Sequence, residues 1–148
     1  MKPVDCIIKN HDEEAGMIGD CHRACIASLL ELDAFDVPHF FDYPVADGSD
    51  PGLKMQELWL AARGLAFIEL PFHPDTKWAK STDEFLKFVS AYSGETHYMV
   101  VGLSIGGHNH SVIAKGDKIV HDPTYGEPHG IVGPCDSGFF WAGWITKL

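Results

Sequence analysis

The stretch Gly19-Asp20-Cys21-His22-Arg23-Ala24-Cys25-Ile26-Ala27-Ser28-Leu29-Leu30 predicts a helix around which the rest of the chain is organised. Asp20 is a favourable N-cap, because its carboxylate can accept hydrogen bonds from the free amides of a first helical turn. From Ala24 onward, small and apolar residues recur three and four positions apart, the spacing of a buried helix stripe. We therefore expect a helix that starts after Asp20, runs to about Leu32 and buries its far end.

The same stretch places Cys21 in the first turn of that helix. Free amides and the positive end of the helix dipole point toward this turn, where they stabilise a thiolate. The pKa of a thiol so placed can fall to roughly 3.5–7.5, which makes a cysteine nucleophilic. The competing interpretation is a small buried hydrophobe, which is what most free cysteines are.

Composition limits the class of protein. The chain has 148 residues, so we expect a single domain over residues 1–148 with a full hydrophobic core. It carries 21 Asp and Glu against 11 Lys and Arg, a formal net charge of -10. This balance argues against nucleic acid and anionic membranes as partners. No stretch approaches the ~20 apolar residues of a membrane span, so no membrane insertion is expected.

The four cysteines are expected to be reduced thiols. Residues 1–9 lack the apolar core of a signal peptide, so a cytoplasmic protein is the default expectation. A bridge between Cys21 and Cys25, one turn apart on one helix face, would strain the helix. The sequence does not indicate an oligomeric state.

Helical patterns in the first part of the chain give way to strand patterns. A helix over 53–63 is expected to bury Met55, Leu58, Trp59 and Ala62. A capping box at Ser81–Glu84 predicts the start of another helix, which is expected to point Phe85, Phe88, Val89 and Tyr92 inward. Strands are expected over 65–70, 97–103, 110–114, 118–121 and 139–146, with a possible short strand over 4–9 and loops over 42–52 and 124–138. Helices followed by an antiparallel sheet make the expected fold class α+β.

One hairpin in the second half brings a histidine to an aspartate. Antiparallel pairing about Gly116 places Val112 opposite Val120 and His110 opposite Asp122. Directly opposite residues have Cβ atoms about 4.5–5.5 Å apart, so the imidazole can meet the carboxylate. Such a carboxylate fixes the imidazole tautomer and frees the other ring nitrogen to serve a thiol. The competing interpretation is two surface residues at strand ends, with the aspartate forming a turn.

Other histidines compete for the role of base. His97 opens the preceding strand and pairs near Gly116, so we expect it at the opposite end of the sheet from Asp122. His121 should point to the other face of the sheet from its neighbour Asp122. His22, at the helix start, is expected to be exposed.

The pattern Asp20-Cys21-x-x-Ala24-Cys25-Ile26-Ala27, a His-led apolar strand and Asp122-Pro123-x-x-Gly126 resembles the papain-like cysteine peptidases. The branch most similar is the C39-like one, whose members trim leader peptides. The run from Cys21 to Leu30, followed by Asp36-Val37-Pro38-His39-Phe40, is even more similar to small uncharacterised phage and bacterial proteins of this fold. Specific matches are confined to residues 20–30 and 110–123.

The resemblance implies a papain-like fold, with the nucleophile helix packed on a C-terminal antiparallel sheet. It also implies a peptide or protein substrate, no cofactor and a catalytic triad. In that triad Cys21 is the nucleophile, His110 the base and Asp122 the group that orients the base.

One departure from the family's pattern concerns the oxyanion. Papain-like enzymes usually carry a glutamine a few residues before the cysteine, and the similar small proteins have it near the position of Cys6. In this chain the single glutamine is Gln56, far downstream. Asn10 is the only side-chain amide upstream, so it is the candidate second donor beside the backbone amide of Cys21. The alternative donors are the N–H groups of His22 and Trp141.

Three functions are compatible with these residues. The first is a thiol hydrolase that cuts a peptide, isopeptide or other amide, and a deamidase or transferase would use the same triad. The second is a catalytically weak or silent binding module on the same fold, such as a phage protein that captures a host factor. The third is a zinc site, for which the spacing Cys-x-x-x-Cys on a helix is unusual, so no metal is expected. Its candidate ligands are Cys21, Cys25, His108, His110, His121 and Asp122.

Overall fold

The computed structural model describes residues 1–42, 51–75, 79–124 and 130–148. Within these ranges it contains three α-helices, a short 3-10 helix and a six-stranded antiparallel sheet, which confirms the α+β class. The helices are α1 (Cys21–Leu30), η1 (Ala34–Asp36), α2 (Pro51–Ala61) and α3 (Thr82–Ser93). The strands are β1 (Leu65–Phe72), β2 (His97–Ser104), β3 (Asn109–Lys115), β4 (Lys118–His121), β5 (Ile131–Gly133) and β6 (Phe140–Lys147). None of the described helices is long and apolar enough to cross a membrane.

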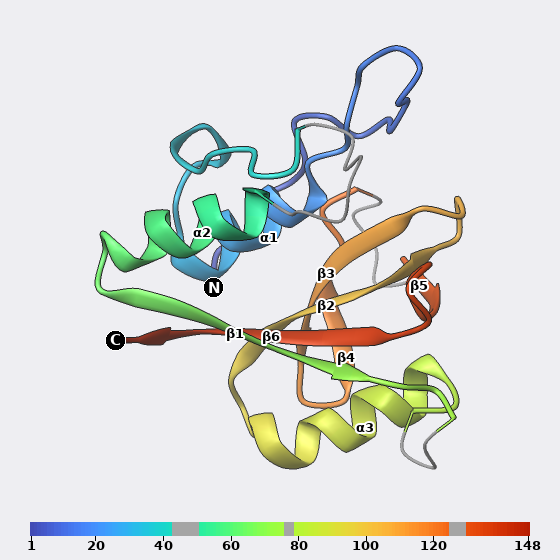
Figure 1. Cartoon of the computed structure of the whole chain (residues 1–148). Helices are drawn as coiled ribbons and strands as arrows, with labels where there is room; N and C mark the ends of the chain where they lie inside the picture. Colours follow the sequence, from blue (N-terminus) through green and yellow to red (C-terminus); the bar gives the residue numbers. More distant parts are fainter. Residues whose placement is uncertain (43–50, 76–78, 125–129) are drawn as a thin grey trace.

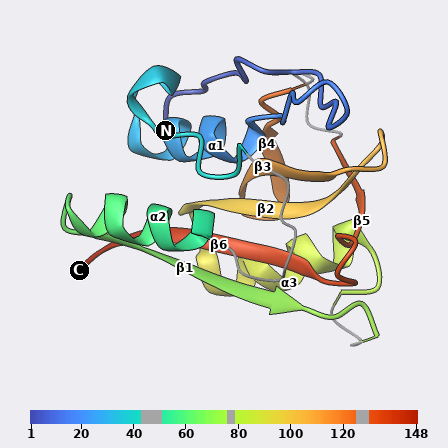
Figure 2. The same cartoon turned by 45° about the horizontal axis from the view of Figure 1, so that its top comes forward.

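The sheet separates two hydrophobic layers. Its strand order is β1-β6-β2-β3-β4, and β5 pairs with the end of β2. Figures 1 and 2 show α1 and α2 over one face and α3 over the other. Alternation along the strands supplies both layers, because Met99 and Ile113 pack with α1 whereas Val100 and Val112 pack with α3.

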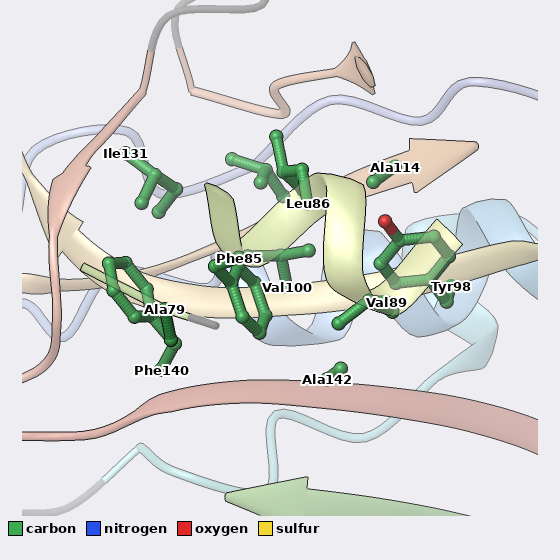
Figure 3. Close-up of a cluster of buried hydrophobic side chains, with 11 residues drawn as sticks. Ala79, Phe85, Leu86, Val89, Tyr98, Val100, Ala114, Ile131, Phe140 and Ala142 are labelled. Atoms are coloured by element: carbon green, nitrogen blue, oxygen red, sulfur yellow. The ribbon is translucent and has the colours of Figure 1, made fainter. Parts of the chain in front are cut away.

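The α3 layer is built from aromatic and aliphatic side chains (Figure 3). Phe85 stacks on Phe140 with ring centroids 4.8 Å apart. The predicted cap of α3 is confirmed, since the Ser81 hydroxyl accepts from the Glu84 amide. The expectation that Tyr92 points inward is wrong, because its side chain is 75% exposed in the last turn of the helix.

The α1 layer holds the predicted nucleophile helix against the middle of the sheet. Cys25, Ile26 and Ala27 are fully buried in the same cluster as Met99 and Ile113. The helix ends at Leu30, two residues earlier than predicted, because Glu31 adopts a left-handed conformation with φ 59°. The buried part of α1 runs from Ala24 to Ser28, and Leu29 and Leu30 at its end are partly buried against the same cluster.

Helix α2 does not bury the stripe that its periodicity predicts. Met55 and Leu58 are 50% and 59% exposed. The buried positions are Gly52, Gln56 and Leu60, so a polar residue occupies the centre of the inward face. The stripe was wrong because apolar spacing cannot reveal that Gln56 has a polar partner on α1. The helix also begins at Pro51, inside the expected loop, of which residues 43–50 lie outside the described residues.

The predicted register of the β3–β4 hairpin is also wrong. Lys115 pairs with Lys118, so the pairing is centred between Gly116 and Asp117 instead of on Gly116. A second shift between Ile113 and Ala114 then puts Ile113 opposite His121. Each shift is a feature of backbone geometry that the residue pattern does not encode.

Two further differences lie in irregular stretches. Residues 4–9, for which the sequence allows a short strand, form none. Part of the loop expected over 124–138 forms β5, and residues 125–129 of that loop lie outside the described residues. A strand as short as β5 is too brief to show a period of two in sequence.

Candidate active site

Cys21 is the first residue of α1 and its side chain is half-buried at the junction with β3. The backbone N–H of Ser111 donates to Cys21 Sγ over 3.4 Å. This amide is available to the sulfur because the β3–β4 ladder ends at Ile113, two residues away. The thiol therefore sits at a helix start and also accepts from the adjoining sheet.

The side chains of His110 and Asp122 meet as predicted, although the register that led to this prediction is wrong. His110 Nε2 lies 3.0 Å from Asp122 Oδ1, and both side chains are buried. The amide of Thr124 also donates to that oxygen over 3.0 Å. Asp122 reaches the imidazole from just beyond the end of β4, so the contact does not need cross-strand pairing of the two residues.

His110 is linked to Cys21 as well as to Asp122. Burial opposes the protonated form of His110, but hydrogen bonds with Asp122 and Cys21 outweigh burial and raise its pKa to about 9. Because Nε2 faces the carboxylate, Nδ1 is the ring nitrogen left for the thiol. His110 therefore stands between the carboxylate of Asp122 and the thiol of Cys21, the arrangement in which an imidazole can exchange a proton with a thiol.

Gly130 is a site residue that the sequence analysis missed. A Cβ at this position would lie 1.8 Å from Asp122 Oδ2 and 3.0 Å from His110 Cδ2. Backbone therefore packs directly against the histidine–aspartate pair, and the position has room only for glycine. A lone glycine in a Gly- and Pro-rich stretch carries no signal that could have identified it.

Asp20 does not cap α1 with its side chain, which corrects the expectation from sequence. Its carboxylate is fully buried and accepts from the amides of Ile7 and Ile8, over 3.2 and 2.8 Å, and from Arg23. Because the carboxylate binds these upstream amides and the Arg23 guanidinium, it does not bind the amides of the first helical turn. As a result, the amides of the first turn are left without this cap and can serve a negatively charged ligand atom.

Among the hydrogen bonds of the described residues, none joins Asn10 to Cys21. Asn10 is exposed and lines an open hollow of about 550 Å³ together with His11 and His108. Cys6, in the segment where the resemblance predicts a glutamine, donates its amide to Pro123 O and places Sγ 3.3 Å from the Thr124 hydroxyl.

The two alternative donors lie on the same face of the sheet as α1. Trp141 is on β6 opposite Val101, with β2 between it and Ser111. His22 was expected to be exposed, but its ring is half-buried and its Nε2 lies 2.6 Å from Gln56 Oε1. No local pattern in the sequence indicates that His22 is half-buried, because its partner Gln56 lies 34 residues further along the chain.

The remaining candidate metal ligands are dispersed. Cys25 is buried in the α1 layer, His121 Nε2 binds Val4 O over 2.9 Å, and the ring of His108 lies 4.7 Å from that of His11. Among the described residues, no group of three or more His, Cys, Asp or Glu side chains is arranged to hold a metal ion. His97 pairs with Lys115 and lies near Leu29 and Leu30, at the other end of α1 from Cys21, as expected.

The other three cysteines are free thiols with raised pKa values. Burial raises the pKa of Cys6 to about 12 and that of Cys135 to about 11. Burial also raises the pKa of Cys25 well above its usual value. These thiols therefore remain protonated and protected near neutral pH.

Comparison of the chain with protein-family models, with curated proteins and with solved structures returns no match. The interpretation of the site consequently rests on its own geometry.

Proposed function

We propose that this protein is a papain-like cysteine hydrolase of the C39-like type, which cleaves a peptide, isopeptide or other amide through a thioester. Cys21 is its nucleophile, His110 its base and Asp122 the residue that orients the base. The observation that carries the proposal is the position of His110, whose Nε2 lies 3.0 Å from Asp122 Oδ1 and whose ring also interacts with Cys21. These three groups come from a helix start, a strand and a turn, so their meeting is a property of the tertiary fold.

The proposed reaction has two stages. The Cys21 thiolate attacks the amide carbon, and the imidazolium of His110 gives its proton to the leaving amine as the C–N bond breaks. Neutral His110 then takes a proton from water, which attacks the thioester and releases the acid and the thiolate. Asp122 holds the ring in one orientation and stabilises the imidazolium at each stage.

The oxyanion formed in each stage needs donors close to the sulfur. The first-turn amides of α1 fit this role, because the Asp20 carboxylate binds the amides of Ile7 and Ile8 and the Arg23 side chain instead of the first-turn amides. The second donor remains a prediction, with Asn10 as its candidate. Asn10→Ala is expected to slow turnover about 100-fold or more and to leave thiol labelling unchanged, because the donor acts only on the oxyanion.

A second candidate function is a binding module on the same fold. It is favoured by one observation, namely that Cys6, in the segment where the resemblance predicts a glutamine, lies against Thr124, with Sγ 3.3 Å from its hydroxyl. A module of this kind would retain a reactive thiol without efficient turnover.

The experiment that tests the proposal is adduct formation with a panel of peptide, ubiquitin-like and small amide electrophiles, read by intact mass and peptide mapping. The proposal predicts one adduct per chain, on Cys21, with a preference for one class of electrophile, and none with Cys21→Ser. Equal labelling of native and unfolded protein by every reagent would contradict it. A reactive Cys21 that turns over no amide of the preferred class would favour the binding module.

A further inference from the structure

The ring of His22 is held by side chains from four other parts of the fold. Its Nε2 lies 2.6 Å from Oε1 of Gln56 on α2, and its Nδ1 lies 3.5 Å from Oγ of Ser111 on β3. Edge contacts with Phe41, at 4.8 Å between ring centroids, and with Phe67 of β1, at 6.0 Å, complete the surroundings. Since His22 directly follows the proposed nucleophile, these contacts fix the first turn of α1.

Gln56 is an unusual choice for a buried position. Its side chain is 2% exposed, and the other buried residues of α2 are Gly52 and Leu60. A buried amide is costly unless it is hydrogen-bonded, so the short bond to His22 accounts for its presence. Because Oε1 carries no hydrogen, His22 Nε2 donates, and the lone pair of Nδ1 faces the Ser111 hydroxyl.

Ser111 connects this arrangement to the sulfur. Its side chain faces His22, while its backbone N–H donates to Cys21 Sγ over 3.4 Å. An N–H group that donates to sulfur stabilises the thiolate more than the thiol. The distance from Ser111 N to the sulfur therefore depends on how α1 is held against β3.

We propose that Gln56 and His22 are positioning residues that hold α1 against β3, so that the Ser111 N–H stabilises the Cys21 thiolate. The inference rests on the proposed function in taking Cys21 as the nucleophile. It adds a second source of thiolate stabilisation, separate from the imidazolium of His110. Among the described residues, His110, Cys6 and Cys25 are titratable groups that interact with Cys21, and Asp20 and His22 flank it in the chain.

The test is the pH dependence of bimane labelling at Cys21 in the full chain. Gln56→Leu removes the acceptor at similar volume, and it is expected to raise the labelling midpoint by about one pH unit, which is about tenfold slower labelling below the midpoint. Gln56→Glu keeps an oxygen facing His22 Nε2 and is expected to keep the midpoint at or below that of the wild type. His22→Phe retains the ring but loses both hydrogen bonds, so it is expected to raise the midpoint as Gln56→Leu does.

Leu60→Val is the matched control, because it loosens the packing of α2 without touching the hydrogen bonds. Its labelling midpoint is expected to stay at the wild-type value. If Gln56→Leu does not fold, His22→Phe decides. A reactive wild type whose midpoint is unmoved by Gln56→Leu and His22→Phe, or is equally moved by Leu60→Val, would overturn this inference alone. An unreactive wild-type Cys21 would overturn the proposed function and this inference together.

Discussion

At the scale of single residues, the reactivity proposed for Cys21 comes from its neighbours. The imidazole of His110 and the amide of Ser111 approach the sulfur from the sheet. Behind the imidazole, Asp122 and Gly130 form a layer with no spare volume. A small change in that layer should therefore be visible at the thiol.

Gly130→Ala tests how tightly this layer is built. The new Cβ would lie 1.8 Å from Asp122 Oδ2, so the carboxylate must move and its bond to His110 weakens. A weaker bond lowers the pKa of His110, and each unit of that decrease corresponds to about a tenfold loss in the stability of the ion pair with Cys21. For a decrease of about one unit, alkylation of Cys21 at neutral pH is expected to be about tenfold slower. The matched control is Gly133→Ala, where an added Cβ meets no atom within 4 Å. Equal rates in the two variants would contradict the packing argument.

The raised pKa of His110 also predicts how stability depends on pH. The pKa is about 9 in the folded protein against an ordinary value of 6.5, so the folded state binds the proton more tightly. This contribution is fully present below about pH 6.5 and is lost as the pH rises through about 9. Its size is roughly 3 kcal/mol, since one pKa unit is worth about 1.4 kcal/mol.

Urea unfolding of the wild type and of His110→Asn measures that contribution together with those of its partners Cys21 and Asp122, because titrating groups that do not interact with His110 cancel in the comparison. The stability advantage of the wild type is expected to be larger at about pH 6 than at about pH 10. A difference that stays constant between these pH values would show that His110 takes up no extra proton on folding.

At the scale of elements, α1 is anchored at its start by a buried ion pair and not by a side-chain cap. Asp20 is fully buried, accepts from two upstream amides and pairs with Arg23. The arrangement holds Ile7 and Ile8 against the helix start and leaves the first-turn amides uncapped by this carboxylate. The proposed oxyanion site therefore depends on where this one carboxylate binds.

Arg23→Met tests the anchor. It leaves the buried Asp20 carboxylate without its cation, and removing one partner of a buried pair typically costs about 3–5 kcal/mol. A loss of about 3 kcal/mol is expected in thermal or urea unfolding. Arg63→Met is the control, because Arg63 is exposed over the Trp59 ring and is expected to contribute about 0.5–1 kcal/mol. Similar small losses in both variants would contradict a structural role for the Asp20–Arg23 pair.

The elements also show how far the sequence could be interpreted. The cap of α3 at Ser81 and the strands 97–103 and 118–121 carry local signals, and they are found where expected. The inward face of α2 and the β3–β4 register depend on partners elsewhere, namely Gln56 with His22 and the turn with its bulge. The contact between His110 and Asp122 was predicted from a wrong register. It still forms, because the two residues remain near each other at the end of the hairpin and their side chains span the shift.

At the scale of the whole molecule, the sheet brings distant segments to one end of α1. The start of α1, the β3 strand and Gly130 meet there, while His97 lies at the other end. The remaining thiols lie in three other places, with Cys25 in the α1 layer, Cys6 in the upstream segment and Cys135 between β5 and β6. One thiol is thereby set apart from the others by the fold as a whole.

Titration with a disulfide reagent tests this separation. One fast thiol per native chain is expected, and all four cysteines should react once the chain is unfolded. The physical reason is burial, which leaves Cys6 and Cys135 6% exposed and Cys25 fully buried. Two or more fast thiols in the native protein would contradict it.

The central claim is that His110, oriented by Asp122, activates Cys21. The most direct measurement is timed iodoacetamide labelling with peptide mapping at neutral pH, on the wild type, His110→Ala, Asp122→Asn and, as a control, His97→Ala. The account predicts that Cys21 labels first in the wild type, that His110→Ala and Asp122→Asn slow it about tenfold or more with the fold intact, and that His97→Ala leaves its rate unchanged. Labelling of Cys21 at the wild-type rate without His110, or preferential labelling of Cys6 or Cys135, would contradict it.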